Sequence, residues 1–300
     1  MRKIYTIICM LSFALSSCEE VITLDIDNEK PQLVVDAYID WKKGDTQAIP
    51  VVHLSYTTDY YSNLPSPKAT GAAVKITTYH SEEYILQEIS HQQFANIFPP
   101  TEYPTVSNHI GGTIYAFPDG ITPVLGRDYI LHIEYEGEKY VAKARMKETA
   151  IVDASRTQQN DNGGIFGNKT EARFFFNGFA NEENAYLVRM KHKQKEDRYT
   201  LDDKFIADQK FFFTTNGFQE ELKKGDQIYV SLYRISYEYK QIIDFLADVA
   251  INDQGRGAGP PSNNIPARIL GNVTHETNPK KNPLGAFRVG QYSEFQYIVK

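Results

Sequence analysis

Cysteine is almost absent from this 300-residue chain, in which Cys9 and Cys18 are the only two. So low a count excludes the disulfide framework that holds small secreted domains together, and it excludes a zinc site built on several thiolates. The fold must therefore rest on a hydrophobic core, for which a chain of this length is ample. Long apolar runs are missing too: the longest, residues 4–15, falls short of the roughly 20 apolar residues that a membrane-spanning helix needs.

Clustered positive charge and recognisable catalytic motifs are missing as well. The 32 Lys and Arg residues are scattered among 38 Asp and Glu residues, which argues against a polybasic nucleic-acid surface. The seven histidines form no His-Glu-x-x-His arrangement, and no Gly-x-Ser-x-Gly elbow or Ser-x-x-Lys pair occurs. The glycines of residues 255–259 precede two prolines instead of a helix, so they form no phosphate loop. We therefore expect a protein that is not an enzyme and has no metal, no cofactor and no nucleic-acid partner.

Residues 1–17 have the parts of a secretory signal peptide. Arg2 and Lys3 open the chain, the apolar run follows, and Leu15-Ser16-Ser17 leads into Cys18. This ending resembles a lipobox, the site at which lipoprotein signal peptidase cuts before an acylated cysteine. The alternative is an ordinary secretory signal with a cysteine there by chance. Cleavage before Cys18 would also remove Cys9, and the loss of Arg2 and Lys3 would take the formal net charge from -6 to -8.

An acidic stretch, residues 18–30, follows the predicted cut. Glu19 and Glu20 come directly after Cys18, and acidic residues at this place resemble the signal that sends Bacteroidota lipoproteins to the cell surface. The alternative is a solvated linker with no sorting role. The carboxylates of residues 25–29 alternate as in a calcium loop but lack its central glycine and final Glu, so we interpret the stretch as a tether. Acyl chains on Cys18 would then anchor the protein to the outer membrane.

The body of the chain is predicted to be mainly β. Residues 129–135 and 140–146 alternate apolar and polar side chains on either side of Gly137, as in a hairpin with one buried face. Similar short runs recur between turns throughout residues 31–147. This pattern is typical of an immunoglobulin-like or transthyretin-like β-sandwich.

Residues 148–300 are predicted to form a second, β-rich domain. The polar run 158–164 is expected to be a loop near the border, because it offers nothing to bury. Apolar side chains recur at helical spacing near residues 237–251, and Ser236 is placed to cap the N-terminus of that helix. We expect this amphipathic helix to pack on the second sheet.

Aromatic residues are the one compositional excess, with 20 Tyr and 17 Phe. Two phenylalanine triplets, residues 174–176 and 211–213, each present rings to both faces of a strand, because successive side chains point to opposite sides. Either both faces are buried, or one carries an exposed aromatic patch for a partner. Tyr60 and Tyr61 lie in a run rich in Pro and Asn that is predicted to be a loop, which makes them candidate residues for binding a partner or ligand.

Nearly the whole chain resembles a Bacteroidota family of outer-membrane lipoproteins that is described only as a domain of unknown function, of the 4249 type. The features that carry the resemblance are Cys18 with its acidic followers, residues 32–39, residues 71–74, the hairpin at residues 126–144, residues 265–273 and residues 282–287. These motifs are structural, and the resemblance supplies no ligand and no site residues. Members are often encoded beside TonB-dependent receptors, which implies an accessory role in uptake.

The sequence therefore favours a surface-exposed outer-membrane lipoprotein that partners a TonB-dependent receptor in nutrient uptake without catalysing a reaction. Two alternatives stay open: a structural or assembly protein of the envelope, and a carboxylate-dependent glycan hydrolase without a recognisable motif. A groove lined with aromatic rings would favour the binding protein, and a flat patch without a groove would favour the structural protein. Two carboxylates facing each other across a groove would favour the hydrolase.

Cys18→Ala should release the protein from the membrane fraction, because no other segment is predicted to hold it there. The measurement is fractionation of cells that make either form, followed by a high-salt wash of the membranes. A Cys18→Ala protein that still pellets with membranes would show that lipid is not the sole anchor.

Overall fold

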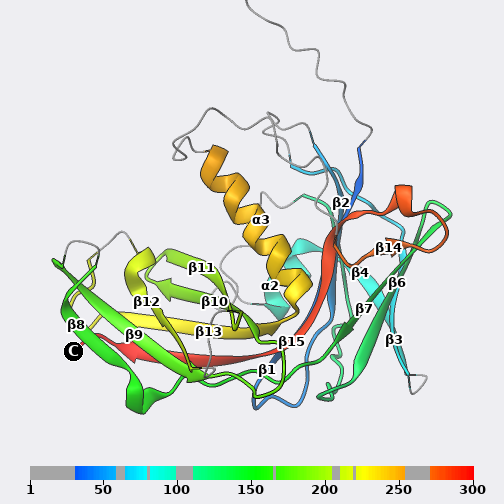
Figure 1. The fold of residues 1–300 in the computed structure, drawn as a ribbon. Helices are drawn as coiled ribbons and strands as arrows, with labels where there is room; N and C mark the ends of the chain where they lie inside the picture. Colours follow the sequence, from blue (N-terminus) through cyan, green and yellow to red (C-terminus); the bar gives the residue numbers. More distant parts are fainter. Residues whose placement is uncertain are drawn as a thin grey trace, which may run out of the picture. The chain divides into compact units, whose positions relative to one another are not determined.

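Strands dominate the computed structural model, which describes residues 31–58, 65–79, 82–98, 111–164, 167–204, 210–218, 221–253 and 271–300. Two α-helices accompany fifteen strands within these ranges (Figure 1). The predicted mainly β class is therefore confirmed. Among the described residues, neither helix combines the length and the apolar character that a membrane span requires.

The elements follow one another in two groups along the chain. The first group is β1 (Leu33–Lys42), β2 (Val51–Tyr56), β3 (Ala73–Thr78), β4 (Glu83–Ile89), α2 (His91–Ile97), β5 (Thr113–Ala116), β6 (Asp128–Tyr135) and β7 (Glu138–Arg145). The second group is η1 (Ala154–Arg156), β8 (Gln158–Gly163), β9 (Lys169–Asn177), β10 (Ala185–His192), β11 (Lys195–Asp202), β12 (Lys210–Thr214), η2 (Thr215–Gly217), β13 (Gln227–Ile235), α3 (Tyr237–Asp253), β14 (Thr274–His275), η3 (Pro279–Lys281) and β15 (Leu284–Ile298).

Twelve strands form one sheet in the order β11-β10-β13-β15-β1-β2-β5-β4-β3-β6-β7-β14, and β12, β9 and β8 form a second sheet. The stretch from β15 to β7 surrounds a first core, in which side chains of β1, β2 and β15 pack against those of β3, β6 and β7. Val35, Leu54, Leu131 and Phe287 are among its buried members. Two β layers over one core make the sandwich that was predicted, whereas the choice between an immunoglobulin-like and a transthyretin-like type stays a prediction.

The predicted hairpin is β6 and β7. The two strands pair from Asp128 opposite Arg145 to Tyr135 opposite Glu138. Glu136 and Gly137 at its tip both have positive φ, 51° and 77°, as the tightest hairpin turns require. At the far end, Arg145 donates to both carboxylate oxygens of Asp128 at 2.6 and 3.0 Å, so side-chain hydrogen bonds supplement the ladder.

Asn272 joins the two ends of the strand series that surrounds the first core. Its side-chain amide donates to the carbonyls of Phe287 on β15 (2.8 Å) and Lys143 on β7 (3.3 Å), and its oxygen accepts from the Phe287 amide (2.8 Å). The backbone passes so close here that a Cβ on Gly271 would lie 1.5 Å from the Gly285 carbonyl oxygen. The motifs around residues 271–273 and 282–287 are therefore structural, as the sequence indicated.

A second core lies between the three-stranded sheet and β10, β11, β13 and β15. Four of the six triplet phenylalanines are buried in it. Phe176 and Phe211 stack at 4.9 Å between ring centroids, and Phe174 and Phe213 lie 5.1 Å apart. The inner face of each triplet is thus core, in agreement with the alternation of a strand.

The prediction of a loop at residues 158–164 is wrong, because residues 158–163 form strand β8 and pair with β9. The run lacks apolar side chains, but an edge strand obtains its stability from backbone pairing and needs few of them. Polar contacts also hold it: the Gln159 side-chain oxygen accepts from the Tyr297 hydroxyl (3.0 Å) and the Lys300 amide (2.9 Å).

Strand β15 belongs to both cores, and Figure 1 shows it in red along both parts of the sheet. From Leu284 to Tyr292 it pairs in parallel with β1, and from Tyr292 to Ile298 it pairs antiparallel with β13. Phe287 packs in the first core and Tyr297 in the second. The predicted division into residues 31–147 and 148–300 stays a prediction, and the structure adds that the C-terminal residues contribute to the first core.

The helix predicted near residues 237–251 is α3, and its predicted cap is confirmed, because the Tyr239 amide donates to the Ser236 hydroxyl at 3.1 Å. Tyr239 and Ile243 pack on the sheet near Leu187 and Tyr233, as expected of an amphipathic helix. Helix α2 was not predicted from the sequence. The sequence feature that indicates its start is a capping box, in which Ser90 and Gln93 exchange side-chain and backbone hydrogen bonds.

A buried ion pair fastens α3, β1 and β15 together. Arg288 donates to both carboxylate oxygens of Asp40, at 2.9 and 2.6 Å, and also to the Tyr239 hydroxyl at 2.6 Å. Its guanidinium lies over the rings of Tyr38 and Tyr239, 5.1 Å from each centroid. Burial alone would lower the pKa of Arg288, but the charge of Asp40 outweighs it and raises that pKa, so the guanidinium stays charged.

Arg288→Met should lower the free energy of unfolding by about 3–5 kcal/mol, because it leaves the Asp40 carboxylate buried and unpaired. Chemical denaturation measures the loss. Lys75→Met is the matched control: it removes an ion pair with Glu83 whose side chains are 43% and 46% exposed, and should cost less than about 1 kcal/mol. Equal losses in the two variants would contradict the structural role of the Asp40 pair. Asp40→Leu combined with Arg288→Met should recover much of the loss.

Candidate functional site

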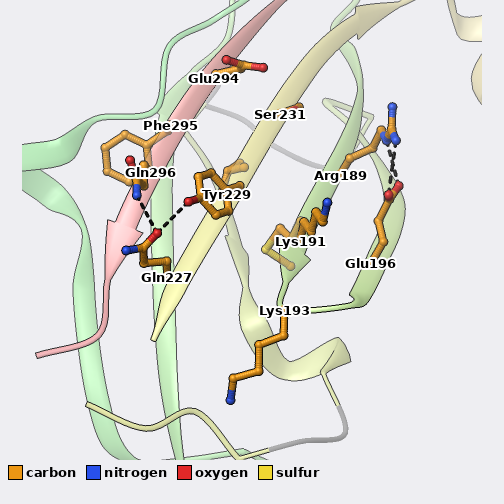
Figure 2. Close-up of a pocket in the computed structure, with 12 residues that line it drawn as sticks. Arg189, Lys191, Lys193, Glu196, Gln227, Tyr229, Ser231, Glu294, Phe295 and Gln296 are labelled. Carbon is orange, nitrogen blue, oxygen red and sulfur yellow. Dashed lines mark hydrogen bonds and ion pairs between the residues drawn. The ribbon is translucent and has the colours of Figure 1, made fainter. Parts of the chain in front are cut away.

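A groove lies on the face of the large sheet that points away from the second core. It has a volume of about 750 Å³ and is lined by residues of β10, β13 and β15, together with Lys193 in the β10–β11 turn and Glu196 on β11. Figure 2 shows these side chains standing on neighbouring strands. The volume falls within the range of small-molecule sites in proteins.

Strand register determines which side chains share the groove floor. Residues opposite one another on β10, β13 and β15 form rows across the sheet. One row is Arg189, Ser231 and Glu294, and the next row on the same face is Lys191, Tyr229 and Gln296. The residues between these rows point to the opposite face and pack in the second core; they are Met190, Val230 and Phe295. On the other side of the Ser231 row, the next residue of β13 on this face is Tyr233, which lies beneath α3. The groove therefore begins where the helix stops covering the sheet.

The centre of the floor is neutral. Tyr229 is 49% exposed, and its hydroxyl donates to the side-chain oxygen of Gln227 at 2.6 Å. Gln296 donates to the same oxygen at 3.2 Å, and dashed lines mark both bonds in Figure 2. An accessible ring beside two side-chain amides and the Ser231 hydroxyl can stack on a flat ligand and exchange hydrogen bonds with it.

One rim of the groove is a network of ionised groups. Arg189 donates to both oxygens of Glu196, at 2.8 and 3.2 Å, and Arg198 donates to Glu196 as well. Burial alone would raise the pKa of Glu196, but the hydrogen bonds from Arg189 and Arg198 outweigh it and hold that pKa below its ordinary value. Glu196 is therefore a carboxylate at neutral pH.

Three further charges complete the lining. Glu294 is paired with Lys42 at 2.5 Å, and Lys193 is paired with Asp226 at 3.3 Å. Lys191, in the row of Tyr229, has no carboxylate partner within the part of the chain that the structure describes. Over the same residues, no group of His, Cys, Asp and Glu is arranged to hold a metal ion.

The outward residues of the phenylalanine triplets form a second surface. Phe212 is 53% exposed, and its ring lies 6.1 Å from that of Phe175. Arg173 lies over Phe212 at 5.2 Å, and Arg156 lies over Phe175 at 5.1 Å. The alternative in which both faces of the triplets are buried is therefore wrong at Phe212, whereas a partner for this surface stays a prediction.

The site residues predicted from sequence lie outside the described residues: Cys18, Glu19, Glu20, Tyr60 and Tyr61. The groove residues were missed. A signal was present in β13 and β15, where polar side chains occupy alternate positions (Gln227, Tyr229 and Ser231; Glu294 and Gln296). That alternation indicates a face turned away from the core, but not that three strands bring these residues together.

Comparisons with known proteins give a family and little more. No curated protein matches the chain. Solved structures that resemble it include a two-domain fibronectin type III segment of chicken tenascin (9% identity, 69% of this chain and 91% of that chain, TM-score 0.20). Another is the chicken interferon gamma receptor alpha chain (9% identity, 69% of this chain and 89% of that chain, TM-score 0.19). Neither carries an argument about this chain at such TM-scores. Residues 19–296 match a family model described as a domain of unknown function, DUF4249, and the chain belongs to that family.

Proposed function

We propose that this protein is a surface-exposed lipoprotein of the outer membrane, anchored through Cys18, that binds a polar ligand in the groove and serves a TonB-dependent receptor in nutrient uptake. The lipobox, Glu19 and Glu20 support the anchor and its orientation. The family resemblance supports the partnership with a TonB-dependent receptor. The observation that carries the binding role is the groove floor, where the exposed Tyr229 ring lies among amide and hydroxyl groups.

The charges of the groove support binding without catalysis. Glycoside hydrolysis needs two carboxyl groups, one of them protonated at working pH. Glu196 is held ionised by Arg189 and Arg198, and Glu294 is paired with Lys42. Glu196, held ionised in this way, is not suited to donate a proton, so the lining favours a binding protein over the hydrolase alternative.

The patch of Phe175 and Phe212 favours a second role, as a docking surface in an envelope assembly. Exposed aromatic rings beside arginines are typical of protein interfaces. This role is compatible with ligand binding, because the patch lies on the outer face of the three-stranded sheet and the groove lies on the large sheet. Tyr60 and Tyr61 stay candidates for the same purpose.

Deleting the gene should slow uptake of particular nutrients, and Tyr229→Ala should slow uptake of the same nutrients. The expected loss of affinity is roughly 2 kcal/mol, or about thirtyfold, because the variant removes the exposed ring from the floor. The measurement is depletion of nutrients from a mixed medium by strains that carry each allele at the native locus. Tyr79→Ala is the matched control, since Tyr79 is a 69% exposed tyrosine outside the groove.

Two results would contradict this proposal. Normal uptake of every nutrient by the deletion strain would contradict the role in uptake. If the Tyr229→Ala strain depletes nutrients like the parent while the deletion strain does not, the groove is not the binding site. Surface labelling of intact cells checks that the variant proteins are made and placed normally.

Glu196→Gln should lower the melting temperature at pH 7, and the difference from the parent protein should shrink as the pH falls below about 4.5, the ordinary pKa of a Glu. A carboxylate whose pKa is lowered by folding contributes stability above its unfolded pKa and loses it as the pH falls through its folded pKa. Thermal melts of both proteins between pH 7 and pH 3 measure the effect. A variant as stable as the parent at pH 7, or more stable, would contradict the stabilising role of the ionised Glu196.

A further inference from the structure

At strands β10 and β13 the groove offers a ligand only side chains. Strand β13 is hydrogen-bonded to β10 on one side and β15 on the other, and β10 is likewise paired with β11 and β13. Their backbone groups are therefore used within the sheet, and a peptide cannot add to them as a further strand. The chemistry of Tyr229, its amide neighbours and Lys191 decides which ligand fits.

The two amides present opposite hydrogen-bonding groups to a ligand. The Gln227 oxygen accepts from both Tyr229 and Gln296, which leaves the amino group of Gln227 as a donor. Gln296 uses its amino group in that contact, which leaves its oxygen as an acceptor. Neighbouring hydroxyls of a sugar ring each donate and accept, so they can use both the donor and the acceptor that the two amides leave open. The Tyr229 ring can stack on the apolar face of the same sugar.

Lys191 adds a charge requirement. The other groove charges are paired within the protein: Arg189 with Glu196, Lys193 with Asp226, and Glu294 with Lys42. Lys191 has no such partner within the described ranges, and it stands directly opposite Tyr229 in the strand register. Side chains paired in this way begin about 5 Å apart, so an anionic group one bond outside a sugar ring stacked on Tyr229 falls within reach of the lysine.

We propose that the groove binds an anionic saccharide, with a sugar ring stacked on Tyr229 and its carboxylate or sulfate group paired with Lys191. This inference rests on the proposed binding function and names the ligand class of the same site. The charged rims favour a chain that runs along the neutral centre between them. The lysine selects acidic chains over neutral ones.

Titration calorimetry of the purified protein with defined hexasaccharides tests the proposal. The probes are a galacturonate hexamer, a neutral glucose hexamer and a sulfated glucose hexamer. The parent protein should bind at least one acidic hexamer about tenfold more tightly than the neutral one, as expected for a hydrogen bond to a charged group. Raising the salt concentration should reduce this preference. The two acidic probes distinguish a carboxylate ligand from a sulfate ligand.

Variants of the lysine and the tyrosine separate charge from stacking. Lys191→Gln should weaken binding of the acidic hexamer about tenfold and abolish the preference for the acidic over the neutral hexamer. Lys191→Arg should retain that preference, because it keeps the positive charge. Tyr229→Ala should weaken binding of every hexamer that binds. Lys139→Gln is the matched charge control, because Lys139 is 58% exposed and lies outside the groove.

Failure of this inference can be told from failure of the proposed function. Equal affinity for acidic and neutral hexamers, or an acidic preference that survives Lys191→Gln, would overturn the charge assignment and leave groove binding intact. Absence of binding to all three hexamers, in a protein whose Tyr229→Ala allele slows nutrient uptake, would overturn the saccharide class alone. A normal Tyr229→Ala strain would remove the groove itself.

Discussion

The buried pair of Asp40 and Arg288 lies where β1, β15 and α3 meet, and the rest of the architecture depends on that junction. Parallel pairing of β1 with β15 joins the first and last strands of the body. The two charges face each other across that pairing, and Tyr239 brings the helix to the same point. A pair so deeply buried is stable only while both partners are present, so it selects one register of β15 and one seat for α3.

The position of β15 decides where the candidate site lies. Its first half completes the sandwich, and its second half continues beyond β1 beside β13. This places Glu294 and Gln296 next to Ser231 and Tyr229. Helix α3 covers the neighbouring row of the sheet, so the uncovered rows become the groove. The same junction therefore stabilises the fold and sets the edge of the candidate site.

Aromatic side chains serve three purposes in this protein. Most of the phenylalanine triplets fill the second core, the tyrosines near Arg288 surround a buried guanidinium, and Tyr229 and Phe212 stay exposed on separate surfaces. The groove combines its ring with neutral amides, whereas the patch of Phe212 combines its ring with arginines. This difference favours a ligand at the first surface and a protein at the second. The proposed role in uptake beside a receptor would use both surfaces.

The sequence by itself determined the β class, the hairpin of β6 and β7, and helix α3 with its Ser236 cap, because each follows from the period of neighbouring side chains or from a local hydrogen bond. It also indicated that each phenylalanine triplet would face two ways. Only the tertiary structure decided that β8 is a strand, since its pairing with β9 is not encoded in its own polar residues. The groove is likewise tertiary. Lys191, Tyr229 and Gln296 are far apart in the chain and meet only through the register of three strands, and no local pattern specifies which strands become neighbours.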